Sequence, residues 1–170
     1  PLSKAYLSGE TNRDRVLVRP EKFYDDKDIN LHTAARVDIV DPERKEVITE
    51  FGETHNYNKL LIATGSRPRA LNVDGSNLEG IHYLRTIADV DAIRFSMKSA
   101  KQVCIVGGGY IGLEVAAVAR KMGLDVTVLE MEERILQRVT TPEMSAFYHE
   151  LHTSRGVDIK TGTMVNGFEG

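Results

Sequence analysis

The spacing of apolar residues in the first half of the chain predicts a small antiparallel sheet. Between residues 35 and 56 apolar side chains recur at every second position, as at Val37 and Ile39 and again at Val47. This is the period of a strand with one covered face. The turn-forming sequence DPERK and Gly52 separate the runs, so the pattern predicts a β-meander. An apolar run, Leu60–Thr64, is expected to follow as a buried strand.

Shorter patterns precede the meander. Residues 1–8 are expected to form a short helix that ends at Gly9, and residues 15–19 an extended segment. Pro20 suits the first position of a helical turn, and Ile29–Leu31 reads as another short strand.

The second half of the chain alternates between helical spacing and short apolar runs. Thr140 or Thr141 is a candidate cap for the last helix, whose expected apolar face is Met144, Phe147 and Leu151, and Gly156 would end it. The order of elements predicts a doubly wound parallel sheet, and therefore an α/β fold. Helices are expected at 88–99, at 111–122 and from the Thr140 or Thr141 cap to Gly156, and strands at 103–106, 125–130, 157–160 and 163–165.

A segment rich in glycine, proline and asparagine, residues 65–80, lies between the two halves. Such composition is typical of a linker. We therefore divide the chain into two parts, residues 1–76 and residues 77–170.

Composition narrows the classes of function. The chain has 170 residues, a net charge of -3, 41% hydrophobic and 28% charged residues. The absence of a basic block argues against nucleic acid as a partner. No apolar run approaches the roughly 20 residues of a membrane-spanning helix. A single cysteine, Cys104, excludes an internal disulfide and favours a reducing, cytoplasmic setting. Its place in an apolar strand predicts a small buried side chain.

The strongest motif is a glycine-rich turn between a strand and a helix. In VCIVGGGYIGLEVAAVARKMGLDVTVLE, from Val103 to Glu130, the glycines fall at 107, 109 and 112. The first glycine permits a tight turn, the second lets the backbone approach a pyrophosphate, and the third lets helix and strand pack closely. Free amide groups at the helix N-terminus favour phosphate there. The motif predicts dinucleotide binding by residues Gly107, Gly108, Gly109, Tyr110, Ile111 and Gly112.

An acidic residue at the end of the next strand completes the motif. Glu130 lies 18 residues after Gly112, close to the spacing of about 20 at which an acid binds the adenosine ribose. A 2′-phosphate would meet Glu130, Glu132 and Glu133 as like charges, which favours NAD(H) over NADP(H). Glu132 and Glu133 have an alternative interpretation as solvated loop residues.

Other candidates are ambiguous from the residues alone. Glu114 sits in the first helical turn, where the helix dipole by itself favours an acid. Lys4 has the alternative of an ordinary surface lysine. His149 and His152 share a helix face, but no third ligand is apparent, so no metal site is expected.

Several phrases together resemble a known family. GGGYIGLEVAA, LLIATGSRPR, PLSKAYLSG, YLRT and SAFYHELHTSRGVDIKTGT are similar to the FAD- and NAD(P)H-dependent pyridine nucleotide oxidoreductases, and within them to the ferredoxin reductase branch. The resemblance covers essentially the whole chain. It implies a two-dinucleotide flavoprotein, of which residues 1–76 would be the β-meander part of the FAD domain, lacking the first glycine motif. Residues 77–170 would be an incomplete Rossmann-like NAD(H) domain, so we expect the sequence to be a middle piece of a longer protein.

The resemblance also implies roles for particular residues. Lys4 would lie beside the flavin ring, and Glu114 would approach both Lys4 and the nicotinamide, which makes them the catalytic candidates. Further contacts with cofactors are implied for Val37, Ala63, Thr64, Gly65 and Arg85 on the FAD side and for Tyr110 and Arg138 on the NAD side.

The function implied is transfer of electrons from NADH through FAD to a ferredoxin or rubredoxin. A disulfide reductase would need a redox-active cysteine near the flavin. The one cysteine of the sequence, Cys104, lies in an apolar strand and does not fit that role, which argues against the disulfide reductase branches. The alternatives are a signalling flavoprotein similar to apoptosis-inducing factor, or an inactive NAD-binding fragment.

Overall fold

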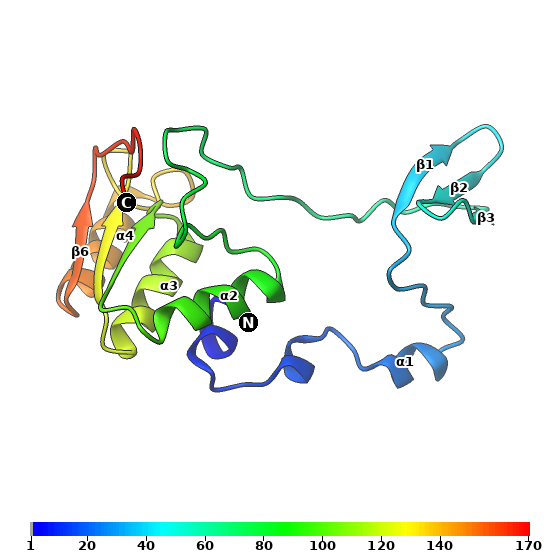
Figure 1. Cartoon of the computed structure of the whole chain (residues 1–170), viewed down its shortest axis with the longest axis horizontal. Helices are drawn as coiled ribbons and strands as arrows, with labels where there is room; N and C mark the ends of the chain where they lie inside the picture. The colour runs from blue at the N-terminus through cyan, green and yellow to red at the C-terminus, as the bar shows by residue number, and fades with distance from the viewer. Residues whose placement is uncertain (1) are drawn as a thin grey trace. The chain divides into compact units, whose positions relative to one another are not determined.

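The structure is a computed structural model that describes residues 2–170. The chain forms two compact units (Figure 1). The small unit is Val18–Ser66, and the large unit combines Pro1–Leu17 with Arg67–Gly170. The proposed division at residues 76 and 77 remains a prediction.

The small unit contains the predicted meander. Strands β1 (Val37–Asp41), β2 (Glu46–Thr49) and β3 (Thr54–Asn56) pair antiparallel in the order β1-β2-β3. The DPERK turn joins β1 to β2, and the Asp41 carboxylate accepts hydrogen bonds from the backbone N–H groups of Glu43 and Arg44. A short helix, α1 (Glu21–Asp25), follows Pro20 as expected.

Two strands expected in the small unit are absent from the part of the chain that the structure describes. Leu60–Thr64 is irregular and exposed, with Leu61 86% and Ile62 67% accessible. The prediction was wrong because an apolar run becomes a strand only beside a partner, and no described segment pairs with this one. Ile29–Leu31 is irregular for the same reason.

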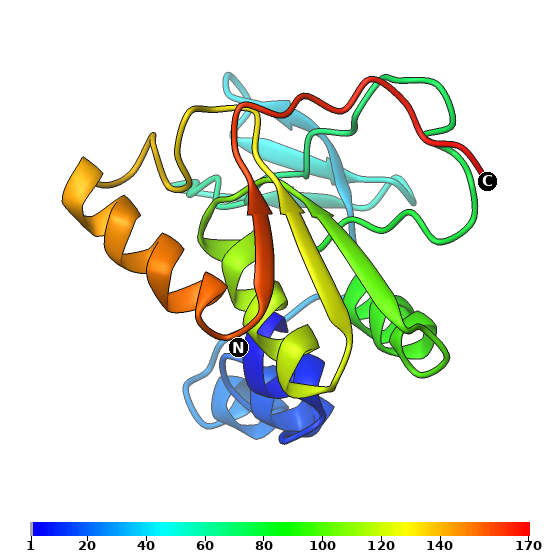
Figure 2. The same ribbon diagram turned by 90° about the vertical axis from the view of Figure 1, so that its left-hand side faces the viewer.

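The large unit is built on a parallel sheet. Strands β4 (Gln102–Val106), β5 (Asp125–Leu129) and β6 (Val157–Lys160) are adjacent in that order, joined by helices α3 (Tyr110–Lys121) and α4 (Pro142–Thr153). In Figure 2 the strands lie in front of α3, and α4 lies beside β6. This arrangement confirms the predicted α/β fold with a β-meander followed by a Rossmann-like unit.

Helices from outside the sheet complete the core of the large unit. Helix η1 (Leu2–Tyr6), which kinks at Lys4, packs on α3 and on α2 (Ile87–Met97). Helix α2 begins with a capping box in which Thr86 and Asp89 bind each other's backbone, an arrangement that satisfies otherwise unpaired N–H groups. The buried core contains Tyr6, Leu7, Val90, Ile93, Met97, Ala116, Val126, Val128 and Val157.

Near η1 one expected element differs. Residues 15–19 were predicted to be extended, but η2 (Arg13–Val16) is a 3-10 helix. The Asn12 side chain accepts a hydrogen bond from the Arg15 N–H, and such a cap stabilises a helical turn that alternation alone does not reveal.

Cys104 is exposed, contrary to the expectation of a buried side chain. Within β5, Val126 and Val128 are buried toward α3, and in β4 the half-buried Val103 and Ile105 also pack against that core. Cys104 points to the opposite face of the sheet because successive side chains alternate. Partial burial still raises the pKa of its thiol.

Helix α4 presents a different face from the one expected. Thr141 caps it, but Met144 is 42% and Phe147 55% exposed, while Ser145 is buried. The Ser145 hydroxyl donates to the Ile135 carbonyl at 2.7 Å, which fixes this face inward. A polar contact therefore overrides the apolar spacing.

Residues 163–165 do not form the predicted strand. The Thr163 N–H donates to the Glu130 carbonyl at 2.9 Å, so the chain leaves the sheet at the carboxyl end of β5. Within residues 2–170, no helix is both long and apolar enough to cross a membrane.

Candidate dinucleotide site

The glycine loop between β4 and α3 requires small residues for reasons of backbone space. Gly107 has φ +113°, a conformation that residues with a side chain rarely adopt. A Cβ atom on Gly112 would lie 2.1 Å from the Gly107 carbonyl oxygen. The loop and the first turn of α3 are therefore packed too closely for a side chain at 112, as the sequence predicts.

Gly109 is different because the space beside it is open. It is the N-cap of α3, no side chain caps that helix end, and an added Cβ would meet nothing within 4 Å. The first N–H groups of a helix have no partner within the helix and carry positive potential. An open, uncapped helix start of this kind suits a phosphate group.

Glu130, which follows β5, is held against the glycine loop. One carboxylate oxygen accepts the Gly108 N–H at 2.7 Å, and the other accepts the Glu132 N–H at 2.9 Å. A Cβ on Gly108 would come within 2.7 Å of Ile135 and 3.2 Å of the Glu130 side chain. The contact thus depends on Gly108, and it fixes the carboxylate at the carboxyl edge of the sheet.

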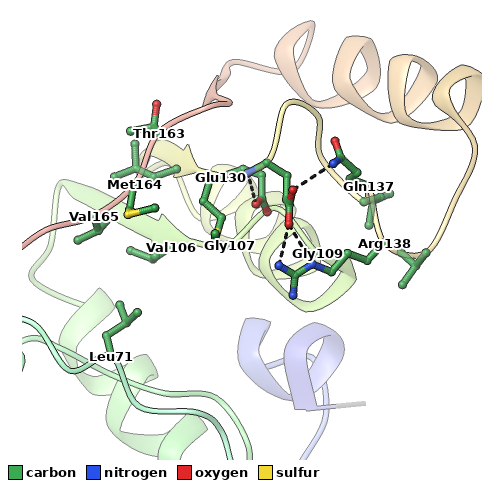
Figure 3. Close-up of a pocket in the computed structure, with 15 residues that line it drawn as sticks. Leu71, Val106, Gly107, Gly109, Glu130, Gln137, Arg138, Thr163, Met164 and Val165 are labelled. Atoms are coloured by element: carbon green, nitrogen blue, oxygen red, sulfur yellow. Dashed lines mark hydrogen bonds and ion pairs between the residues drawn. The ribbon is translucent and has the colours of Figure 1, made fainter.

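A cavity of about 390 Å³ opens beside these groups (Figure 3). Its walls are mostly apolar, with the carboxylates of Glu130 and Glu132 and the guanidinium of Arg138 as charged groups. Ligand pockets commonly combine an apolar lining with a few fixed polar groups. The apolar wall includes Leu71, Val106, Leu129, Leu136, Val139, Met164 and Val165.

Glu132 is the centre of a side-chain network on the rim of this cavity. Its Oε1 accepts hydrogen bonds from Arg138 Nε at 3.1 Å and Nη2 at 2.7 Å. Its Oε2 accepts from Gln137 Nε2 at 3.0 Å. The hydrogen bonds and charge of Glu132 raise the pKa of the Arg138 guanidinium.

A second polar cluster lies where η1 meets α3. Lys4 Nζ is 2.5 Å from Glu114 Oε1, and the Ser3 hydroxyl donates to Glu114 Oε2. Burial alone would raise the pKa of Glu114, but the Lys4 and Ser3 hydrogen bonds and the Lys4 charge lower it below its usual value. Glu114 therefore stays ionised, while 54% of the Lys4 side chain remains exposed to solvent or a ligand.

Comparison with known proteins shows which family the chain belongs to. Residues 1–170 match the family described as pyridine nucleotide-disulphide oxidoreductase. The chain belongs to this family. A ferredoxin–NAD(P)(+) reductase of a Sphingomonas species is 42% identical over 97% of the chain and 40% of its own length. Putidaredoxin reductase of Pseudomonas putida is 42% identical over 99% of the chain and 41% of its own length.

A solved structure agrees with these sequence matches. The ferredoxin reductase from Rhodopseudomonas palustris is 37% identical, with a TM-score of 0.95 over 100% of the chain and 42% of that protein. The chain therefore spans about two fifths of the length of the relatives it matches.

Within this pyridine nucleotide oxidoreductase chain, the expected site residues fall into groups. The glycine loop, Glu130 and Arg138 lie around one cavity, and Lys4 meets Glu114 directly. Tyr110 and Ile111, at the start of α3, are 48% and 54% exposed. The Tyr110 ring lies edge-on to Tyr148 at 6.5 Å.

The remaining expected contacts are distributed between the units. Val37 lies in β1, and Ala63, Thr64 and Gly65 lie in the irregular segment after it, all within the small unit. Arg85 belongs to the large unit, where its N–H donates to Asp89 just before α2. Their roles toward FAD remain predictions.

Sequence reasoning missed some residues of both clusters. Ser3 went unnoticed, although it directly precedes Lys4 in the PLSK phrase. Gln137 and the segment 163–165 also line the cavity, and no periodic signal could have identified them. No group of three or more histidine, cysteine or acidic residues within residues 2–170 is arranged to hold a metal ion.

Proposed function

We propose that the protein containing this chain is an FAD-dependent NADH reductase that passes electrons to a ferredoxin or rubredoxin. The observation that carries the proposal is the open start of α3 at Gly109, with the Glu130 carboxylate fixed beside it at the mouth of a cavity. The named relatives, which are ferredoxin and putidaredoxin reductases, supply the class of reaction.

The groups around the cavity fit the ADP half of NAD(H). The uncapped N–H groups of α3 suit the pyrophosphate, and Gly109 leaves room for it. The Glu130 carboxylate suits the ribose hydroxyls as a hydrogen-bond acceptor. The apolar walls suit the adenine ring, with Arg138 at the rim of the site.

The Lys4–Glu114 pair fits the reacting end of the two cofactors. FAD, when bound, accepts a hydride from NADH and releases electrons singly. Glu114 holds the Lys4 ammonium in one position, and the ammonium remains exposed enough to contact a ring placed beside it. A fixed cation next to a flavin ring stabilises negative charge that develops during reduction. Ser3 restrains the other oxygen of Glu114 and so orients the pair.

The electron acceptor and the cellular location are also parts of the proposal. The first is supported by the named relatives and the second only by the composition of the chain. Relatives that are named as reductases favour a ferredoxin or rubredoxin partner over the signalling alternative. A cytoplasmic location is inferred from the single cysteine in the sequence.

Cofactor selectivity tests the assignment of the dinucleotide site. With Glu130 accepting the ribose hydroxyls, NADH should exceed NADPH in kcat/KM by roughly two decades, because a 2′-phosphate would meet a fixed carboxylate. Glu130→Ala should narrow that ratio, mainly by lowering activity with NADH. The matched control is Glu133→Ala, an exposed acid of the same loop. Equal use of NADH and NADPH by the parent protein would refute the assignment.

A further inference from the structure

Arg138 is the cationic side chain that lines the cavity in the described chain, and its binding edge is already occupied (Figure 3). Nε and Nη2 of the guanidinium both donate to Oε1 of Glu132. These two N–H groups form the planar fork with which arginine usually grips a carboxylate or a phosphate. The ion pair therefore occupies this edge of Arg138 and leaves an added phosphate only the end-on donors at Nη1 and Nη2.

Glu132 is itself held in place. Gln137 donates to its second oxygen at 3.0 Å, and the Gly162 N–H donates to its carbonyl at 2.9 Å. The Glu132 side chain is 27% exposed, against 72% for Arg138. The carboxylate is thus the more buried partner and has contacts besides the arginine.

We propose that Glu132 is a specificity-determining residue that excludes 2′-phosphorylated dinucleotides by engaging Arg138. This inference rests on the proposed function, since it assigns a discriminating role within the same NAD(H) site. Glu130 meets the adenosine ribose directly, whereas Glu132 acts through the arginine. With Glu132 neutral, the freed guanidinium becomes a phosphate receptor at the mouth of the cavity.

The competing explanation is simple repulsion, in which Glu132 matters only as one negative charge among several. The two explanations differ in what Arg138 does after Glu132 is removed. Under repulsion, the gain in affinity for a phosphorylated ligand does not need the arginine. In the proposed explanation, which we call masking, Glu132 acts by occupying Arg138. The gain in affinity then disappears when the arginine is also removed, and a double-mutant cycle measures this coupling.

The experiment measures binding of NADH, NADPH, 5′-ADP and 2′,5′-ADP by calorimetry, using the protein with FAD bound. The variants are Glu132→Gln, Arg138→Gln and the double variant, with Glu133→Gln as the matched control that removes one nearby charge. Glu132→Ala accompanies them, because a glutamine amide can still accept one hydrogen bond from Arg138.

Masking predicts that Glu132→Gln or Glu132→Ala tightens binding of NADPH and 2′,5′-ADP about tenfold, the effect of one new charge-assisted contact. Binding of NADH and 5′-ADP should change by less than about threefold. The double variant should lose the gain, and Glu133→Gln should show none. The gain should also shrink at high salt, because it depends on an exposed charge.

Three results would overturn the inference. Equal tightening in Glu132→Gln and in the double variant would show that Arg138 plays no part, and equal tightening by Glu133→Gln would show that net charge alone decides. Unchanged NADPH binding in both Glu132 variants, with NADH still bound, sinks this inference but leaves the proposed function intact. A parent protein that binds neither NADH nor 5′-ADP refutes the proposed function itself.

Discussion

Two glycines of the same loop should respond to alanine in opposite ways. At Gly112 an alanine Cβ would lie 2.1 Å from the Gly107 carbonyl oxygen, a contact that must open to at least 3.0 Å. Both atoms belong to the backbone region of one tight turn, so the helix or the loop has to move. At Gly109 the same Cβ meets nothing within 4 Å, and the backbone is extended with φ -79°.

The magnitudes follow from these contacts. Forcing extra atoms into a packed site costs about 1–3 kcal/mol, and alanine regains about 1 kcal/mol of helix propensity at an interior position. Because the clash involves the main chain, we expect Gly112→Ala to destabilise the protein by about 2 kcal/mol. Gly109→Ala should change the free energy of unfolding by less than about 1 kcal/mol.

NADH affinity should distinguish the two variants in the opposite way from stability, because Gly109→Ala is expected to lose affinity while keeping its stability. Gly109→Ala places a methyl group where the pyrophosphate would approach α3, so NADH affinity should fall at least tenfold in a protein of normal stability. Urea unfolding gives the stability of each variant, and calorimetric titration with NADH gives the affinity. Normal NADH binding by Gly109→Ala would mean that no phosphate lies over this helix start. Parental stability in Gly112→Ala would refute the packing argument for the third glycine.

Two further predictions concern ionisable groups. If Lys4 and Glu114 flank the flavin, Glu114→Gln should slow flavin reduction by NADH in stopped-flow measurements more than it weakens NADH binding, and an unchanged rate would return the pair to a structural role. Partial burial, with a smaller effect of the nearby Arg155 charge, lowers the pKa of His152 below 6.5. The neutral imidazole thus contributes stability that is complete above the unfolded pKa and is lost as pH falls through the folded pKa. His152→Gln should flatten the fall in unfolding free energy between pH 7.5 and pH 5, roughly the range around that pKa, whereas parallel curves for parent and variant would contradict this.

The parallel sheet was predictable because its elements are defined locally. Helical spacing, short apolar strands and the glycine turn all lie within the sequence from 87 to 160, and the structure follows them closely. Each helix and strand there finds its partner within the same unit. Local pattern and long-range packing agree, which is the condition for prediction from sequence to succeed.

The predictions that were wrong concerned features that depend on distant partners, which a local sequence pattern does not specify. Leu60–Thr64 has the composition of a strand, but a strand depends on a neighbour that its own residues cannot specify. Cys104 was misjudged because a fully apolar run predicts a strand that is covered on both faces, and its own residues do not show whether anything covers the second face. The network at Glu132 joins residues five and six positions apart in an irregular loop, a spacing that belongs to no periodic rule.

The hydrogen bond between Glu130 and the Gly108 N–H constrains how a preference for cofactor can change over evolution. A replacement of Glu130 that removes this acceptor also releases the glycine loop, so the first step toward a new cofactor would weaken binding of both dinucleotides. The side chain of Glu132 contacts the half-buried Gln137 and the exposed Arg138 instead of the loop. A lineage that acquires NADPH use by single substitutions would therefore meet a shallower fitness valley by way of position 132 than by way of position 130.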